Sequence, residues 1–167
     1  MTSGLKRIVF IVNPISGVGR QKRILGDIDL VVDKNIYDVD VKYTDSQGHA
    51  TFLSREAAEG GADVVVAVGG DGTVNEVAAG LAGTEAALGI VPAGSGNGLA
   101  RHLGIPVNLR GSLHLLNKGR IATIDSATIN GEFFVNLAGI GFDAMVAKKF
   151  AVAGTRGFST YFRIIAG

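Results

Sequence analysis

The sequence predicts an α/β fold with a parallel sheet, followed by the start of a β-rich second domain. Up to about residue 119, short apolar runs end at glycine-rich loops and alternate with segments of helical spacing. Repeated strand, loop and helix units of this kind are typical of a parallel sheet covered by helices. From about residue 120 the pattern changes, because two runs flank Asn130-Gly131, the dipeptide most often found in a two-residue hairpin. We therefore expect an α/β domain at residues 1–119 and the beginning of a second domain at residues 120–167.

Four strands of the sheet are predicted from their side chains. Residues 8–12 form a β-branched run that ends at Asn13-Pro14, and residues 38–44 alternate apolar and polar side chains. Residues 64–68 are continuously apolar, which is the pattern of a strand buried on both faces. We predict that this third strand is central and that residues 88–91 form a fourth.

The helices are expected between these strands. The spacing of Thr73 and Glu76 predicts a capping box, which opens a helix that ends near Gly83. Further helices are expected in the polar, basic segment after Gly19, at residues 49–59 and, as one or two turns, at residues 99–103.

The hairpin is expected at residues 121–129 and 132–137. An isolated hairpin is marginal in water, and the chain ends on an apolar run that has no partner in this sequence. We therefore expect the chain to be the front part of a longer protein.

Composition excludes several classes of function. The 167 residues are 47% hydrophobic and 19% charged, which suits a folded domain with a sizeable core. The net charge of +1 does not supply the positive field used for non-specific nucleic-acid binding, so no nucleic acid is expected as a partner. The absence of cysteine excludes disulfides and thiol nucleophiles. The apolar run at residues 8–12 is too short for a signal peptide or a membrane span, and we expect a cytoplasmic protein.

The segment GGDGTVNE, residues 69–76, lies between the predicted central strand and a helix N-terminus. Glycines let the backbone approach a bound phosphate, and the free amides and dipole of the first helical turn favour its negative charge. Asp71 is the unusual member, because a carboxylate repels phosphate unless a magnesium ion or a transferable proton lies between them. Asp71 is therefore a candidate catalytic residue. In the alternative interpretation the glycines form a tight turn, and Thr73 and Glu76 only cap the helix.

Two more glycine-rich loops follow predicted strands. They are NPISG at residues 13–17 and PAGSGNG at residues 92–98. Loops at the carboxyl ends of parallel strands converge on one crevice, where open α/β sheets bind ligands. The three loops together favour a nucleotide site.

These motifs, in their order and spacing, resemble those of a known family. NPISG, GGDGTVNE and PAGSGNGLA, followed by the D-x(n)-F-x-N-x-A-G-x-G-F-D-A run from Asp125 to Ala144, resemble the catalytic domain of the diacylglycerol kinase and sphingosine kinase superfamily of lipid kinases. The resemblance covers most of the chain. It implies a three-layer Rossmann-like nucleotide domain and a mostly β second domain, which packs against it and closes the lipid cleft.

The resemblance also implies site residues. Asp71 falls on the aspartate of the GGDGT motif, which is proposed as the base in sphingosine kinases. Asp125 falls where bacterial members have an aspartate in a magnesium-linked network, although half of that network's pattern is missing at Gly98, and the metal ligands stay unassigned. Asp143 lies in the region that meets the lipid headgroup in sphingosine kinases. The implied ATP contacts are Asn13, Pro14, Ser16, Gly17, Thr44, Gly70, Asp71, Gly72, Thr73, Asn75, Glu76 and Ser95.

The activity that the resemblance implies is transfer of the γ-phosphoryl group of ATP, with Mg²⁺, to the hydroxyl of a diacylglycerol or a sphingoid base. Such an enzyme would contact the membrane surface transiently to reach its lipid substrate. The sequence Asn97-Gly98 is closer to the GSGN of sphingosine and ceramide kinases than to the Asn-Asp of bacterial diacylglycerol kinases, so the lipid stays open. The alternatives are an NAD kinase-like enzyme and a non-catalytic nucleotide-binding regulatory module. The oligomeric state is also open, with a homodimer among the choices.

Overall fold

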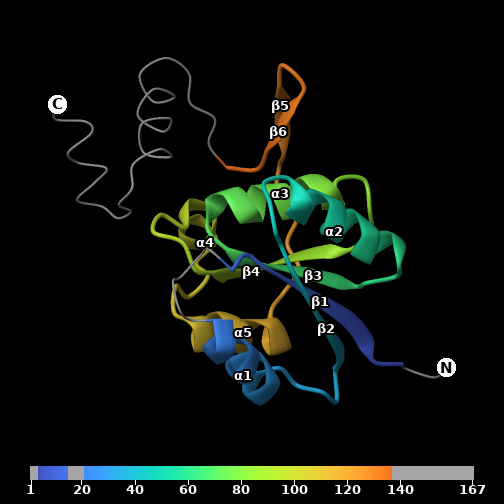
Figure 1. Ribbon diagram of the computed structural model, residues 1–167, viewed down its shortest axis with the longest axis vertical. Coiled ribbons are helices and arrows are strands. Elements are labelled where there is room, and N and C mark those ends of the chain that lie inside the picture. The colour runs from blue at the N-terminus through green and yellow to red at the C-terminus, as the bar shows by residue number, and fades with distance from the viewer. Residues whose placement is uncertain (1–3, 15–20, 137–167) are drawn as a thin grey trace, which may run out of the picture. The chain divides into compact units, whose positions relative to one another are not determined.

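The computed structural model describes residues 4–14 and 21–136, in which parallel strands form one sheet with helices on both faces (Figure 1). The strand order is β2-β1-β3-β4, and every neighbouring pair is parallel. The predicted three-layer α/β fold is confirmed. The strands are Lys6–Val12 (β1), Tyr37–Tyr43 (β2), Val64–Gly69 (β3) and Ala87–Pro92 (β4).

The two internal strands are apolar on both faces. Residues 8–12 of β1 and 65–68 of β3 are at most 1% exposed. A strand buried on both faces needs such a continuous apolar run, and the prediction that residues 64–68 form an internal strand is confirmed. In contrast, β2 lies at the edge of the sheet, and its side chains are only partly buried.

The helices bury one apolar core on each face of the sheet. α1 (Gln21–Val31) and α5 (Leu109–Lys118) cover the face that contains Phe10. α2 (His49–Glu59) and α3 (Asp71–Leu81) cover the opposite face, together with the short α4 (Gly98–His102). Figure 1 shows these two layers on either side of the sheet. No helix within the described ranges is both long and apolar enough to cross a membrane.

The predicted hairpin is confirmed but shorter than expected. It consists of β5 (Ala127–Ile129) and β6 (Glu132–Phe134), and residues 121–126 are not in a strand. Asn130 and Gly131 both have positive φ, 51° and 84°, as a type I′ turn requires. The chain divides into compact units at residues 1–135 and 136–167, with the hairpin in the first. A domain boundary at residue 119 stays a prediction.

Two helices differ from the sequence-based expectation. The patterns above do not predict α5, although Asn108 caps it in the usual way by accepting a hydrogen bond from the Gly111 amide at 2.7 Å. The predicted capping box in α3 is wrong. The helix begins at Asp71 with Gly70 as its N-cap, which places Thr73 inside the first turn, where it makes no capping hydrogen bond.

Candidate functional site

The topology places the candidate site between β1 and β3. From β1 the chain crosses through α1 to β2 on one side, and from β2 it crosses through α2 to β3 on the other side. The direction of winding reverses at this point, and open α/β sheets bind ligands at the carboxyl ends of the strands beside such a reversal. Asn13 and Pro14 follow β1 there, and Gly70 to Gly72 follow β3.

Asn13 and Thr73 connect the two sides of this reversal. The side-chain amide of Asn13 donates to the hydroxyl of Thr73 at 3.1 Å, and the backbone amide of Asn13 donates to the Val68 carbonyl at 3.0 Å. Thr44 directly follows β2 and lies beside the end of β1, since its amide donates to the Val12 carbonyl at 3.0 Å. Three of the residues predicted to contact ATP, Asn13, Thr44 and Thr73, therefore lie at the carboxyl ends of the strands.

The loops after β3 and β4 contact each other through glycines. A Cβ atom on Gly94 would lie 2.5 Å from the Gly70 Cα, and one on Gly70 would lie 3.3 Å from the Gly94 Cα. Glycine at both positions lets the two backbones touch. The absence of a side chain at Gly70 is thus already explained by loop packing, without any bound phosphate.

Gly72 has different surroundings. A Cβ atom at this position would meet no atom within 4 Å, so the packing of the described residues does not require glycine there. Gly72 is exposed in the first turn of α3, where backbone N–H groups lack partners within the helix. Those amides can donate hydrogen bonds to an anion at this helix end, and the helix dipole stabilises its negative charge.

Asp71 connects the first turns of α3 and α4. Its Oδ1 accepts a hydrogen bond from the Gly98 amide at 2.6 Å, and its Oδ2 lies beside Gly96, 2.8 Å from the place of a Cβ atom there. The carboxylate is exposed at the same edge as Gly72. Asp71 therefore has a structural contact with the loop before α4, and it is also accessible to a ligand.

The loop after β4 is closed by Asn97, which is not among the implied ATP contacts. Asn97, buried and with a positive φ of 54°, accepts a hydrogen bond from the Gly94 amide at 3.0 Å and donates one to the Gly94 carbonyl at 2.7 Å. Asparagine tolerates positive φ and its side chain bonds readily to nearby backbone groups, so an asparagine in a strand-to-helix loop is a signal for such a turn. Ser95 is exposed at the tip of this loop.

Asn75 and Glu76 point to other elements. The Asn75 amide group donates to the Phe133 carbonyl at 3.0 Å and accepts from the Val135 amide at 3.2 Å, so it binds the backbone of the β6 region. The Glu76 carboxylate accepts from the Ala50 amide in the first turn of α2 at 3.3 Å. The structure therefore does not bring these two side chains together with Asp71 and Gly72.

The structure describes only some of the residues that were predicted to bind a metal ion or the lipid. Among residues 4–14 and 21–136, no group of at least three His, Asp or Glu side chains could hold a metal ion. Asp125 is exposed in the segment before β5. Ser16, Gly17 and Asp143 lie outside the described residues.

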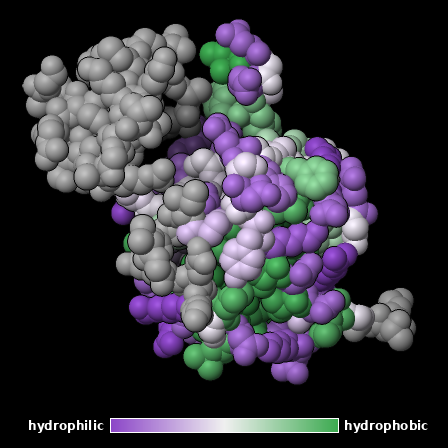
Figure 2. All heavy atoms as spheres, viewed as in Figure 1, coloured by the Kyte–Doolittle hydropathy of each residue, from purple (hydrophilic) through white to green (hydrophobic). Residues whose placement is uncertain are grey.

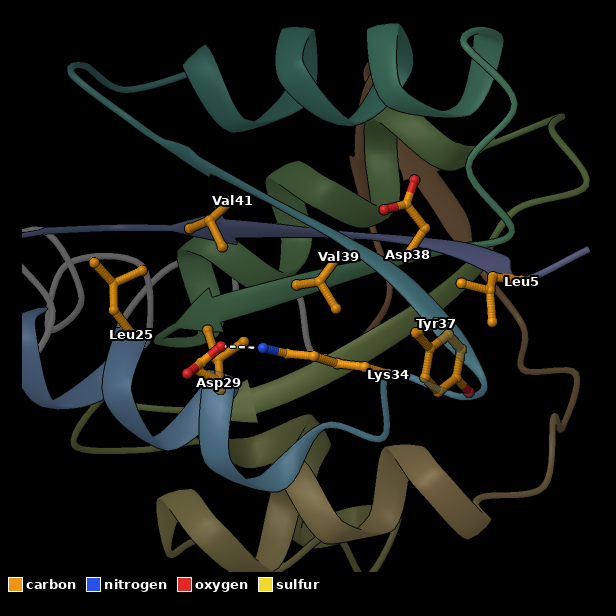
Figure 3. A pocket seen from close by; sticks show the side chains of 9 residues that line it. Leu5, Leu25, Asp29, Lys34, Tyr37, Asp38, Val39 and Val41 are labelled. Carbon is orange, nitrogen blue, oxygen red and sulfur yellow. Dashed lines mark hydrogen bonds and ion pairs between the residues drawn. The ribbon is translucent and has the colours of Figure 1, made fainter.

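Two cavities of the described region have no residue of the GGDG loop in their lining. One of about 360 Å³ includes Pro92 and Ala93 at the end of β4 and reaches Arg23 and Leu109. The other, of about 540 Å³, lies beside β2 and α1 (Figure 3). Neither of these cavities is lined by Asp71 or Gly72, and both residues are exposed at the strand ends.

Comparison with known proteins identifies the family. The model of the diacylglycerol kinase catalytic domain matches residues 7–129. The chain belongs to this family. A diacylglycerol kinase from Staphylococcus epidermidis is 36% identical over 138 residues, which cover 81% of this chain and 44% of the relative. A diacylglycerol kinase from Staphylococcus aureus has the same identity and coverage.

Solved structures agree with this diacylglycerol kinase family assignment. A diacylglycerol kinase from Bacillus anthracis str. Sterne matches with a TM-score of 0.67 and 32% identity, over 77% of this chain and 48% of that one. A putative diacylglycerol kinase from the same organism matches with a TM-score of 0.69 and 32% identity, over 77% and 47%. The chain spans less than half the length of these relatives. The resemblance found in the sequence motifs is confirmed.

Proposed function

We propose that this chain supplies the ATP-binding part of a lipid kinase, which transfers the γ-phosphoryl group of ATP to the hydroxyl of a diacylglycerol. The observation that carries the proposal is the exposed N-terminus of α3 at the reversal of the sheet, where Gly72 leaves open space. The names of the relatives favour a diacylglycerol over a sphingoid base or NAD.

The phosphates of ATP would bind at the first turn of α3. Backbone amides there act as donors, and the absence of a side chain at Gly72 allows close approach. Asn13 and Thr73 would complete this edge from the two sides of the reversal. The other proposed ATP contacts are Pro14, Ser16, Gly17, Thr44, Gly70, Asp71 and Ser95. Asn75 and Glu76 are not among them, because their side chains bond to the β6 region and to α2.

The donor set suits magnesium in the form of MgATP. Magnesium in phosphoryl-transfer sites is held by one or two carboxylates together with substrate phosphates and water. The exposed Asp71 provides one carboxylate beside the proposed phosphate position. When bound, the ion would neutralise charge on the phosphates.

Asp71 is the proposed catalytic carboxylate. The lipid hydroxyl oxygen forms the new bond to the γ-phosphorus, the bond from that phosphorus to the β–γ bridging oxygen breaks, and ADP leaves. The hydroxyl proton passes to the base. Asp71 has the required exposure, and the Gly98 amide orients its carboxylate. Its other proposed role is to coordinate magnesium.

Lipid contact is proposed for Asp143, and the enzyme would touch the membrane surface while it binds its substrate. We also propose that the domain boundary lies near residue 119, so that the chain contains the nucleotide domain and the beginning of the lipid-binding part.

A transfer assay tests the proposed function. The intact protein is incubated with ATP labelled at the γ-phosphate, magnesium, and vesicles that contain diacylglycerol or sphingosine, with NAD in a separate reaction. We expect label in the diacylglycerol product. Label in sphingosine or NAD instead would show that diacylglycerol is not the substrate. ATP binding without transfer to any acceptor would favour a regulatory module.

Two variants separate the roles of Asp71. Asp71→Asn keeps an oxygen that accepts from the Gly98 amide but removes the charge, whereas Asp71→Ala removes both. If Asp71 is the base, turnover falls by about 100-fold to 10,000-fold in both variants. Stability falls by about 0.5–2 kcal/mol in Asp71→Ala alone. Full turnover in Asp71→Asn would show that Asp71 only holds the loops together, and a joint loss of ATP and magnesium affinity would show metal coordination.

A further inference from the structure

The outer edge of β2 is an unpaired strand edge. β2 pairs with β1 on its inner side, and within the described residues no strand pairs with its outer side. The Thr44 amide donates to the Val12 carbonyl, and backbone groups alternate in direction along a strand. The even-numbered residues of β2 therefore bond to β1. The N–H and C=O groups of Val39, Val41 and Tyr43 point to the outer edge.

A groove of about 540 Å³ lies beside this edge, on the face of the sheet that α1 covers, and it is lined by apolar side chains and by the ion pair of Asp29 with Lys34. Figure 3 shows Val39, Val41 and Tyr37 of β2 on one side of the groove and Leu25 of α1 on another. Leu25 is 40% exposed. Hydrophobic residues also form a patch in the lower half of Figure 2, where Figure 1 places α1 and β2. The groove and the strand edge are thus continuous.

The opposite face of β2 carries charges of both signs. Asp38, Asp40 and Lys42 alternate with the valines, so their side chains lie on the other face of the strand, and Figure 3 shows Asp38 pointing away from Val39. The Lys42 ammonium contacts the Glu56 carboxylate at 2.6 Å, and Arg7 lies 3.9 Å from Asp40. Charges on an exposed strand edge often oppose pairing with another chain, so their register decides whether two copies can pair.

One antiparallel register of β2 with itself places opposite charges together. With the two-fold axis at Val41, Asp40 lies opposite Lys42 of the second copy, and Val39 lies opposite Tyr43. An axis at Asp40 or at Lys42 would put like charges opposite each other, and an axis at Val39 would put Asp38 opposite Asp40. The register at Val41 also pairs every outward N–H of Val39, Val41 and Tyr43 with a carbonyl, since the outward-facing residues meet as hydrogen-bonded pairs.

We propose that the outer edge of β2 is the interface between two copies of this chain, paired antiparallel about a two-fold axis at Val41. The two sheets become one continuous sheet, and the interface is isologous. The apolar side chains of each β2 cover the groove beside the other copy. On the opposite face, Arg7 and Asp40 of one copy continue into Lys42 and Glu56 of the other as a row of alternating charges.

Two charge-reversal variants test this interface, first each alone and then mixed with each other. Asp40→Lys alone places lysine opposite Lys42, and Lys42→Asp alone places aspartate opposite Asp40, so each variant opposes its own pairing. We expect the dimer dissociation constant to rise at least about tenfold in each. An equimolar mixture of the two variants restores two opposite-charge pairs, and we expect it to dimerise again. Sedimentation equilibrium measures the association.

Asp38→Lys is the matched control, because in this register residue 38 lies opposite Thr44 and not opposite a charge. It should leave the dimer intact, and circular dichroism should show that all three variants fold. Three results would overturn the proposal: a monomeric wild type, as expected if another segment of the polypeptide covers the edge; a dimer that neither reversal weakens; or a mixture that stays monomeric. None of these results depends on ATP binding or kinase activity.

Discussion

The contrast between Gly72 and Gly94 tests where the phosphates bind. A Cβ atom at Gly72 would meet no atom within 4 Å, and the φ of this residue is not in the left-handed region. Alanine is favoured over glycine in a helix by about 0.5–1 kcal/mol, because its backbone has less freedom to lose. We therefore expect Gly72→Ala to unfold at the same temperature as the wild type or above it. The same methyl group would occupy the proposed path of the phosphate.

The expected loss of affinity follows from one displaced contact. A hydrogen bond to a charged group contributes about 1.5–3 kcal/mol, so losing one should weaken ATP binding by roughly 10-fold to 150-fold. Calorimetric titration of the intact protein with ATP and magnesium measures the affinity, and thermal unfolding of the same sample measures stability.

Gly94→Ala is the matched control with the opposite signature. Its Cβ atom would lie 2.5 Å from the Gly70 Cα and 3.0 Å from the Asn97 Oδ1, so one of the loops must move. Overpacking of this kind costs about 1–3 kcal/mol, and we expect a lower unfolding temperature. Substituting Gly70 would disturb the same contact and is a poorer probe of phosphate binding. Unchanged ATP affinity in a stable Gly72→Ala protein would refute the proposed phosphate position.

Three further predictions concern stability. Asn75→Ala removes both hydrogen bonds to the backbone at Phe133 and Val135, and hydrogen exchange of the Val135 amide should become faster while exchange in the β1 core stays slow. The hydrogen bond and charge of Lys42 lower the pKa of Glu56 below its usual 4.5, so the ion pair stabilises the fold at pH values above 4.5. The difference in stability between the wild type and Glu56→Gln should disappear as the pH falls through the pKa that Glu56 has in the folded protein. Phe10→Ala should lower the free energy of unfolding by about 3–5 kcal/mol in chemical denaturation, because Phe10 is fully buried.

Most of the fold is predictable from the sequence because it depends on local patterns. The strands at 8–12 and 64–68 follow from continuous apolar runs, and the hairpin turn follows from Asn130-Gly131, the residue types that tolerate positive φ. The helix at residues 49–59 has the predicted bounds, because Gly60 and Gly61 end it. These signals each lie within a few residues of the element that they define.

The candidate site is less predictable because its contacts are long-range. Glycine-rich loops after strands predict the edge where ligands bind, but they do not show that Gly70 packs on Gly94 or that Asp71 accepts from Gly98. Those contacts depend on the pairing of β3 with β4 and on the positions of two helices. Spacing in the sequence carries no information about them.

The error at the predicted capping box shows how one motif serves two purposes. Glu76 has the spacing to cap its own helix, yet it accepts from the Ala50 amide of α2, whose N-cap residue is Gly48 and has no side chain to accept that bond. Four residues along a helix advance by about 6 Å, so Asn75 and Glu76 lie one turn beyond Asp71 and Gly72 and meet different neighbours. Asp71 and Gly72 are exposed at the strand ends, while Asn75 and Glu76 hold the β6 region and α2 against α3. Variants at residues 71 and 72 should therefore change nucleotide chemistry with the fold intact, whereas variants at 75 and 76 should act first on the packing of these neighbours.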